Sequence, residues 1–203
     1  MSAPQLARLA VVGTGLIGAS VALAARRAGV DAVVGWDPDA EALGVAAERD
    51  AVEPAASLAN AVEGTDLVVV AAPVGDLPAT VREVLDRAGD ACTVTDVGST
   101  KRPVSTAAAS DARFIGGHPI CGAETRGPGR AAAELFEGAT WFLTPTAATD
   151  PDAIKRAPVT TPVGRLDEAA AARRPDLRHQ FGEDADQPAA ADVATTPSDV
   201  PTA

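Results

Sequence analysis

The part of the sequence most able to do chemistry is a short segment around one histidine, Phe114–Gly122, which reads F-I-G-G-H-P-I-C-G. The chain contains only two histidines, and the other, His179, falls in a segment whose composition shows little sign of order. Imidazole titrates near neutrality, so His118 can accept a hydroxyl proton as hydride leaves the same carbon. The glycines and the proline around it predict a loop shaped to hold the imidazole, and His118 is therefore the first candidate for a catalytic base.

Two other readings of this histidine stay open. A lone histidine is more often structural, or a solvated surface group, than catalytic. Cys92, His118 and Cys121 could instead bind zinc, but they show no paired ligand spacing and would need a fourth ligand. We therefore expect no bound metal. The two cysteines give no disulfide framework, which favours a cytoplasmic location.

A glycine motif near the start of the chain predicts a dinucleotide site. Val12–Ser20 reads V-G-T-G-L-I-G-A-S, in which the G-x-G-x-x-G pattern lies between an apolar strand and a helix. The first glycine allows a tight turn, the second a close approach of the backbone to a pyrophosphate, and the third close packing of the helix. A tight turn that binds no ligand is the alternative. The candidate cofactor-binding residues of this motif are Gly13, Gly15, Leu16, Ile17 and Gly18.

An acidic residue at the end of the second expected strand predicts which dinucleotide binds. Asp37 follows Gly18 by nineteen residues, where a carboxylate accepts hydrogen bonds from both ribose hydroxyls of NAD. The same charge repels the 2′-phosphate of NADP, and the next residues, Pro38 and Asp39, offer no arginine to offset it. The expected cofactor is therefore NAD rather than NADP.

Two loops after later strands supply further candidates. Ala72 and Pro73 end an apolar strand beyond the point where strand order reverses, so this loop can line the cofactor cleft, although an ordinary strand exit is the alternative. Ser99 follows the next strand, where its hydroxyl can bond a substrate oxygen. Helix capping is the alternative for Ser99, but Pro103 is expected to interrupt any helix early. Lys101 is interpreted as a structural or phosphate-side charge rather than a nucleophile.

Apolar runs alternate with Ala-rich stretches up to about Thr144, which predicts an α/β fold of the Rossmann type with a doubly wound, mostly parallel sheet. Gly29 is expected to close the first helix as a left-handed cap. Tyrosine is absent and aromatic residues make up 3%, so Val, Leu, Ile and Ala must build the core. The strands are expected at Leu9–Val12, Ala32–Gly35, Leu67–Ala71, Thr93–Asp96, Arg113–Gly116 and Trp141–Leu143, and the helices at Leu16–Ala28, Ala40–Arg49 and Leu77–Ala88.

The composition changes at Pro145, and half of the sixteen prolines lie from there onward. We therefore divide the chain into an NAD(P)-binding domain, residues 1–145, and an Ala-, Pro- and Asp-rich tail of low order, residues 146–203. The formal net charge of −11 opposes binding to nucleic acid or to an anionic membrane. No targeting segment or membrane span is expected, and the partner is expected to be a small-molecule substrate.

Four segments in order resemble the prephenate/arogenate dehydrogenase family of tyrosine biosynthesis: G-T-G-L-I-G-A-S, D-V-G-S-T-K, G-G-H-P-I-C-G-A-E and L-F-E-G-A-T-W-F-L-T-P. The resemblance runs from about Leu6 to Pro145. It implies an enzyme that oxidatively decarboxylates prephenate, or arogenate, with NAD(P). It further implies that His118 takes the proton of the ring hydroxyl while hydride passes to the nicotinamide, and that Ser99 orients this hydroxyl and the imidazole.

The resemblance stops where members of this family continue into an all-helical second domain, which builds the dimer and completes the substrate site. Nothing after Pro145 is similar to it, so we expect the family homodimer interface to be absent and prephenate to be oxidised poorly or not at all. One hypothesis is that the tail is a truncated or frame-shifted replacement. The alternatives are an arogenate dehydrogenase, a non-catalytic dinucleotide-binding relic, or a β-hydroxy-acid-type dehydrogenase, which would use a lysine on a later helix.

Overall fold

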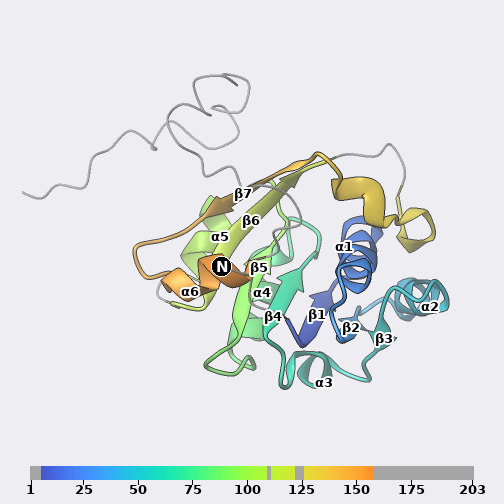
Figure 1. Ribbon diagram of the computed structural model, residues 1–203. Helices are drawn as coiled ribbons and strands as arrows, with labels where there is room; N and C mark the ends of the chain where they lie inside the picture. Colours follow the sequence, from blue (N-terminus) through green and yellow to red (C-terminus); the bar gives the residue numbers. More distant parts are fainter. Residues whose placement is uncertain (1–5, 109–110, 122–125, 158–203) are drawn as a thin grey trace, which may run out of the picture.

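A seven-stranded sheet forms the centre of the molecule, and helices cover both of its faces (Figure 1). The computed structural model describes residues 6–108, 111–121 and 126–157. The strand order across the sheet is β3-β2-β1-β4-β5-β6-β7. The strands are β1 (Arg8–Val12), β2 (Ala32–Trp36), β3 (Glu53–Pro54), β4 (Leu67–Val70), β5 (Thr93–Asp96), β6 (Phe114–Ile120) and β7 (Thr140–Thr144).

The topology confirms a doubly wound, mostly parallel sheet. All neighbouring strands from β3 to β6 pair in parallel, and only β7 joins antiparallel, at the edge beside β6. The chain winds outward from β1 in one direction through β2 and β3, and in the other through β4, β5 and β6. The order therefore reverses between β1 and β4, and ligands of open α/β sheets bind beside the carboxyl ends of the strands at such a point.

Two buried clusters, one on each face of the sheet, hold the helices in place. Within β1, Leu9 and Val11 belong to the cluster beneath the first two helices, whereas Ala10 and Val12 belong to the opposite cluster. This alternation follows from the period of two along a strand, and each fully buried Val contributes roughly 1.5–3 kcal/mol. The helices are α1 (Leu16–Arg27), α2 (Ala40–Glu48), α3 (Leu58–Val62), α4 (Leu77–Leu85), α5 (Arg102–Ala107) and α6 (Pro151–Arg156), with 3₁₀ turns η1 (Pro128–Arg130) and η2 (Ala133–Phe136).

Each of the six expected strands and three expected helices is present, with ends that differ by a few residues. Gly29 has φ of +86°, which confirms the left-handed cap after α1. The expectation that Pro103 would interrupt a helix is wrong, because Pro103 lies in the first turn of α5. The missing N–H of a proline has no intrahelical partner at that position, so the helix loses nothing.

The expected loop around His118 is also wrong, because the segment is strand. Strand β6 runs from Phe114 to Ile120, and its second half pairs antiparallel with β7, so that His118 lies opposite Phe142. Gly116 and Gly117 are not among the residues with positive φ, so neither glycine serves a turn here. The sequence pattern missed this extension because the glycines interrupt the apolar run, while the partner strand that stabilises them comes more than twenty residues later.

Helix α6 lies beyond the expected domain boundary at residue 145 and packs against β5 and β6. Its start is held by Asp150, whose side chain accepts a hydrogen bond from Asp152 N and whose N–H donates to Ala112 O at 2.8 Å. The rest of the predicted low-order tail, residues 158–203, lies outside the described part of the chain. Within the described part, none of the helices has the length and apolar character needed to cross a membrane.

Candidate active site

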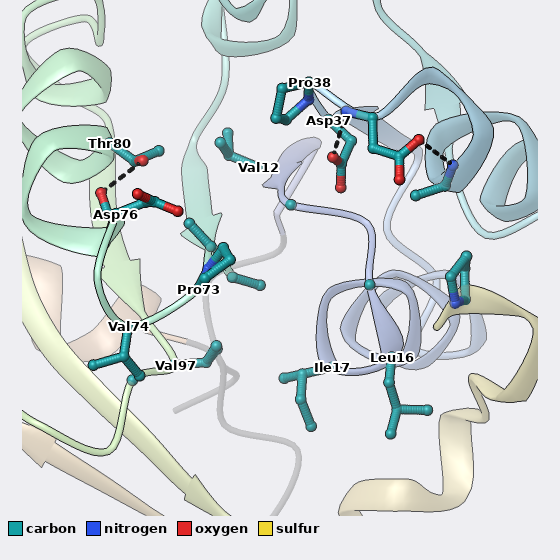
Figure 2. Close-up of a pocket in the computed structure, with 18 of the residues that line it drawn as sticks. Val12, Leu16, Ile17, Asp37, Pro38, Pro73, Val74, Asp76, Thr80 and Val97 are labelled. Carbon is teal, nitrogen blue, oxygen red and sulfur yellow. Dashed lines mark hydrogen bonds between the residues drawn. The ribbon is translucent and has the colours of Figure 1, made fainter. Parts of the chain in front are cut away.

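A cleft of about 970 Å³ opens at the carboxyl ends of the central strands. This volume is at the upper end of the range for small-molecule sites. Figure 2 shows Leu16 and Ile17, from the start of α1, on one side of the cleft, and Pro73, Val74 and Val97 on the other. Its walls therefore come from the loops on both sides of the β1–β4 reversal point.

The glycine loop between β1 and α1 has the steric character that the motif predicts. Gly13 has φ of +94°, and a Cβ there would lie 2.6 Å from the carbonyl oxygen of Ala71. A Cβ at Gly18 would lie 1.9 Å from the carbonyl oxygen of Gly13. A Cβ at Gly15, in contrast, would meet no atom within 4 Å, and Gly15 lines the cleft. The first and third glycines are thus required by the fold itself, and the second leaves open space toward the cleft.

Helix α1 presents its first turn to this cleft. Gly15 is the N-cap residue, and no side chain in the described part of the chain caps the helix start. Leu16 and Ile17 follow it and line the cleft. The first N–H groups of a helix lack intrahelical partners and carry the positive end of its dipole, so they can bind an anionic group such as a phosphate.

Asp37 lies at the end of β2 and contacts the glycine loop directly. Its Oδ2 accepts hydrogen bonds from Thr14 N at 2.5 Å and from Thr14 Oγ1 at 3.1 Å, and its Oδ1 accepts from Asp39 N at 2.9 Å. Asp37 also lines the cleft. The carboxylate therefore anchors the loop, a role that sequence reasoning missed. The signal was available in Thr14, the polar residue between the first two glycines, which is fully buried.

The loop after β5 brings Ser99, and strand β6 brings His118, to the same cleft. Burial lowers the pKa of His118, the positive charge of Lys101 lowers it further, and the negative charge of Asp96 opposes both effects. The imidazole is therefore held in the neutral form that can accept a proton. Cys121 also lines the cleft, and burial raises the pKa of its thiol.

A buried ion pair, which sequence reasoning did not single out, lies beside His118. Asp96 is fully buried at the end of β5, and Lys101, 9% exposed, stands at the start of α5. The Lys101 ammonium forms a short bond to Asp96 Oδ2 and donates to the carbonyl oxygen of Gly117 at 2.6 Å. Burial lowers the pKa of Lys101, while the charge of Asp96 raises it.

The structure brings nearly all of the predicted site residues to one place. The cleft is lined by Gly13, Gly15, Leu16, Ile17, Asp37, Ala72, Pro73, Ser99 and His118. Gly18 is the exception, because it is buried in the first turn of α1, against the carbonyl oxygen of Gly13. Among the described residues, no three His, Cys, Asp or Glu side chains group around a possible metal position, so the alternative of a zinc site at Cys92, His118 and Cys121 gains no support.

Comparison with known proteins identifies a family for this chain. Residues 21–161 match the family model described as the nucleotide-binding domain of prephenate dehydrogenase. The matched range contains Asp37, Ser99 and His118 and begins after the glycine loop. The probable prephenate dehydrogenase NovF of Streptomyces niveus is 36% identical over 151 residues, which is 72% of this chain and 40% of that protein.

Two solved structures have a similar fold. Synechocystis arogenate dehydrogenase aligns with a TM-score of 0.69 and 29% identity over 80% of this chain and 60% of that one. The prephenate dehydrogenase from A. aeolicus, in complex with hydroxyphenyl propionate and NAD⁺, aligns with a TM-score of 0.66 and 30% identity over 73% of this chain and 54% of that one. This chain therefore spans 40% to 60% of the length of these three relatives.

Proposed function

Because this chain belongs to the prephenate dehydrogenase family, as its nucleotide-binding domain, we propose that it binds NAD and supplies the catalytic base for the oxidative decarboxylation of prephenate. The observation that carries the proposal is the single cleft that joins the glycine loop, Asp37, Ser99 and His118. A dinucleotide site and a neutral imidazole in one cavity support a dehydrogenase rather than a binding module.

The residues fit a dinucleotide without rearrangement. Gly15 leaves open space for a pyrophosphate, and the uncapped start of α1 supplies N–H donors and a positive dipole end. Asp37 stands where a carboxylate meets the adenosine ribose in this class of fold. When bound, the nicotinamide ring supplies the hydride acceptor of the reaction.

The chain's own residues contribute proton transfer and orientation. His118 in its neutral form accepts the proton of the substrate's ring hydroxyl, and the hydroxyl of Ser99 orients that group. The apolar walls formed by Ile17, Pro73 and Val97 restrict water near the reacting atoms. Loss of carbon dioxide leaves an aromatic ring, which makes the reaction irreversible.

Two measurements on the purified chain test the proposal. Isothermal titration calorimetry is expected to show saturable binding of NAD, and absence of binding would overturn the assignment of the cleft. Formation of NADH on addition of prephenate tests the second half of the proposal. Arogenate is assayed in parallel, because the Synechocystis structure is that of an arogenate dehydrogenase. Faster turnover of arogenate would reassign the substrate and leave the cofactor and the base in place.

Removal of the charge at Asp37 is expected to weaken discrimination between NAD and NADP. In D37S the preference for NAD should fall by at least about tenfold, or ~1.4 kcal/mol, because the repulsion of a 2′-phosphate is lost. The affinity for NAD itself should also fall, since Asp37 anchors the glycine loop through Thr14. Calorimetry with both dinucleotides measures the two effects.

A matched variant separates these two effects of Asp37. T14V removes the hydroxyl bond to Asp37 Oδ2, keeps the backbone bond, and leaves the carboxylate charge in place. It should change the affinities for NAD and NADP by the same factor. If T14V altered the preference as much as D37S does, loop position rather than charge would determine the choice of dinucleotide.

The pH dependence of turnover should reflect the lowered pKa of His118. The neutral imidazole is the active form, so kcat/KM should fall as pH drops through this pKa and stay level above it. Because burial and Lys101 lower the pKa, the decline should begin at a lower pH than for an ordinary histidine. A pH profile of kcat/KM checks this, and an acid limb above the ordinary histidine range would contradict it.

A further inference from the structure

The backbone of Gly117, the residue before His118, is held on both sides by buried charged side chains. Its N–H donates to Asp96 Oδ1 at 3.1 Å, and its carbonyl oxygen accepts from Lys101 Nζ at 2.6 Å. Asp96 Oδ2 also accepts from Gly98 N at 2.9 Å and pairs with Lys101. The two side chains thus connect the end of β5 and the start of α5 to the backbone of one residue of β6.

This connection begins where the backbone pairing of β5 and β6 ends. The parallel register between these strands stops at Thr95 and Ile115, two residues before Gly117. Beyond this point β6 follows β7, the edge strand, and the side chains of Asp96 and Lys101 take the place of the missing ladder bonds. These two side chains therefore connect the segment with His118 to β5 and α5 beyond the end of the ladder.

The glycines around this segment make room for the ion pair. A Cβ at Gly116 would lie 3.2 Å from Lys101 Cδ, and a Cβ at Gly117 would lie 2.5 Å from the carbonyl oxygen of Asp96. Side chains alternate along a strand, so His118 shares with Gly116 the face of β6 that the Lys101 stem covers. Gly117 is therefore required by the close approach of the β5 backbone, and Gly116 leaves room for the stem of Lys101.

We propose that Asp96 and Lys101 are positioning residues for His118: they fix the imidazole through the backbone of Gly117 and place a positive charge beside it. The proposal rests on the proposed function of His118 as the base. A buried ion pair contributes little net stability, so a role in holding the site explains its presence better than a role in folding. The direction of the pKa of His118 agrees, since Lys101 lowers it and Asp96 raises it.

The test is a nuclear magnetic resonance titration of His118 in the chain, with wild type, K101M and D96N compared. K101M removes the repelling charge and should raise the pKa of His118, whereas D96N removes the attracting charge and should lower it. Opposite signs are specific to a charge pair beside the imidazole, because general loosening of the fold would move both variants in the same direction. R102M, the same kind of change at an exposed neighbour in α5, should leave the pKa where it is. Arg126 and Cys121, which also line the cleft, are unchanged in all variants.

K101M leaves Asp96 with the N–H groups of Gly98 and Gly117 as donors, so its carboxylate keeps partners if the variant folds. Should D96N fail to fold, K101M alone decides, and an unchanged or lowered pKa overturns the proposal. Should K101M fail to fold instead, D96N alone decides, and an unchanged or raised pKa of His118 in D96N overturns the proposal. Where wild-type turnover is measurable, the acid limb of kcat/KM should move in the same direction as the titration. Failure of the wild-type chain to bind NAD overturns the proposed function and leaves the titration readable.

Discussion

Replacement of the proposed base, H118N, is expected to reduce kcat/KM for prephenate by roughly 10²–10⁴-fold, the range for removal of a general acid or base. Asparagine keeps a polar side chain of similar size but has no titratable nitrogen, so the hydroxyl proton has no acceptor. NAD affinity should not change, because His118 belongs to β6, while the glycine loop and Asp37 lie on the far side of the β1–β4 reversal point. Initial rates of NADH formation, together with calorimetry of NAD binding, measure both parts.

The chain offers a matched control for this variant. H179N makes the same change at the only other histidine, which is not among the candidate site residues. It should keep wild-type turnover. The acid limb of the pH profile, which we assign to His118, should disappear from whatever residual turnover H118N retains. Turnover of H118N at the wild-type rate would show that the imidazole does not carry the proton, and would favour the dinucleotide-binding relic.

The parts of the fold that follow a regular pattern could be predicted from the sequence. In β1 and β4 every residue that packs on a helix is Val, Leu, Ile or Ala, so the apolar runs alone identify the strands. The helix signals were equally local, such as Gly29, whose positive φ confirms the cap. The short β3 was not predicted, because its two residues, Glu53 and Pro54, are exposed and have no apolar pattern. Its place depends on pairing with β2, which no local signal encodes.

The candidate site was predicted as a set of residues but not as a geometry. Spacing identified Asp37, Ser99 and His118 because each follows an expected strand, and the structure brings all three to one cleft. Their contacts were out of reach, since the bonds of Asp37 to Thr14 and of Lys101 to Gly117 join residues 23 and 16 positions apart. Asp96 was a usable signal, because it ends a strand that is expected to be buried, and a buried carboxylate requires a partner.

In the glycine loop, two similar substitutions should have different consequences for stability but should both weaken NAD binding. In G18A the new methyl group would lie 1.9 Å from the carbonyl oxygen of Gly13 and 3.0 Å from Val11 Cγ1. The start of α1 must therefore move away from β1. We expect G18A to lower the free energy of unfolding by about 1–3 kcal/mol, the usual range for overpacking of a buried contact, and to lose NAD affinity as a consequence.

G15A should leave the fold intact and still lose the cofactor. Its methyl group would meet no atom within 4 Å, and the backbone φ of −64° suits alanine. The gain from a less flexible unfolded chain is opposed by the loss of a favourable N-cap residue, so the free energy of unfolding should change by no more than about 1 kcal/mol. The methyl group would occupy the space that a pyrophosphate needs, so NAD affinity should fall by at least about tenfold, or ~1.4 kcal/mol. Thermal unfolding with and without NAD separates the two variants. If G15A bound NAD like the wild-type chain, the dinucleotide could not lie against this loop, and Gly15 would be a structural residue of the turn.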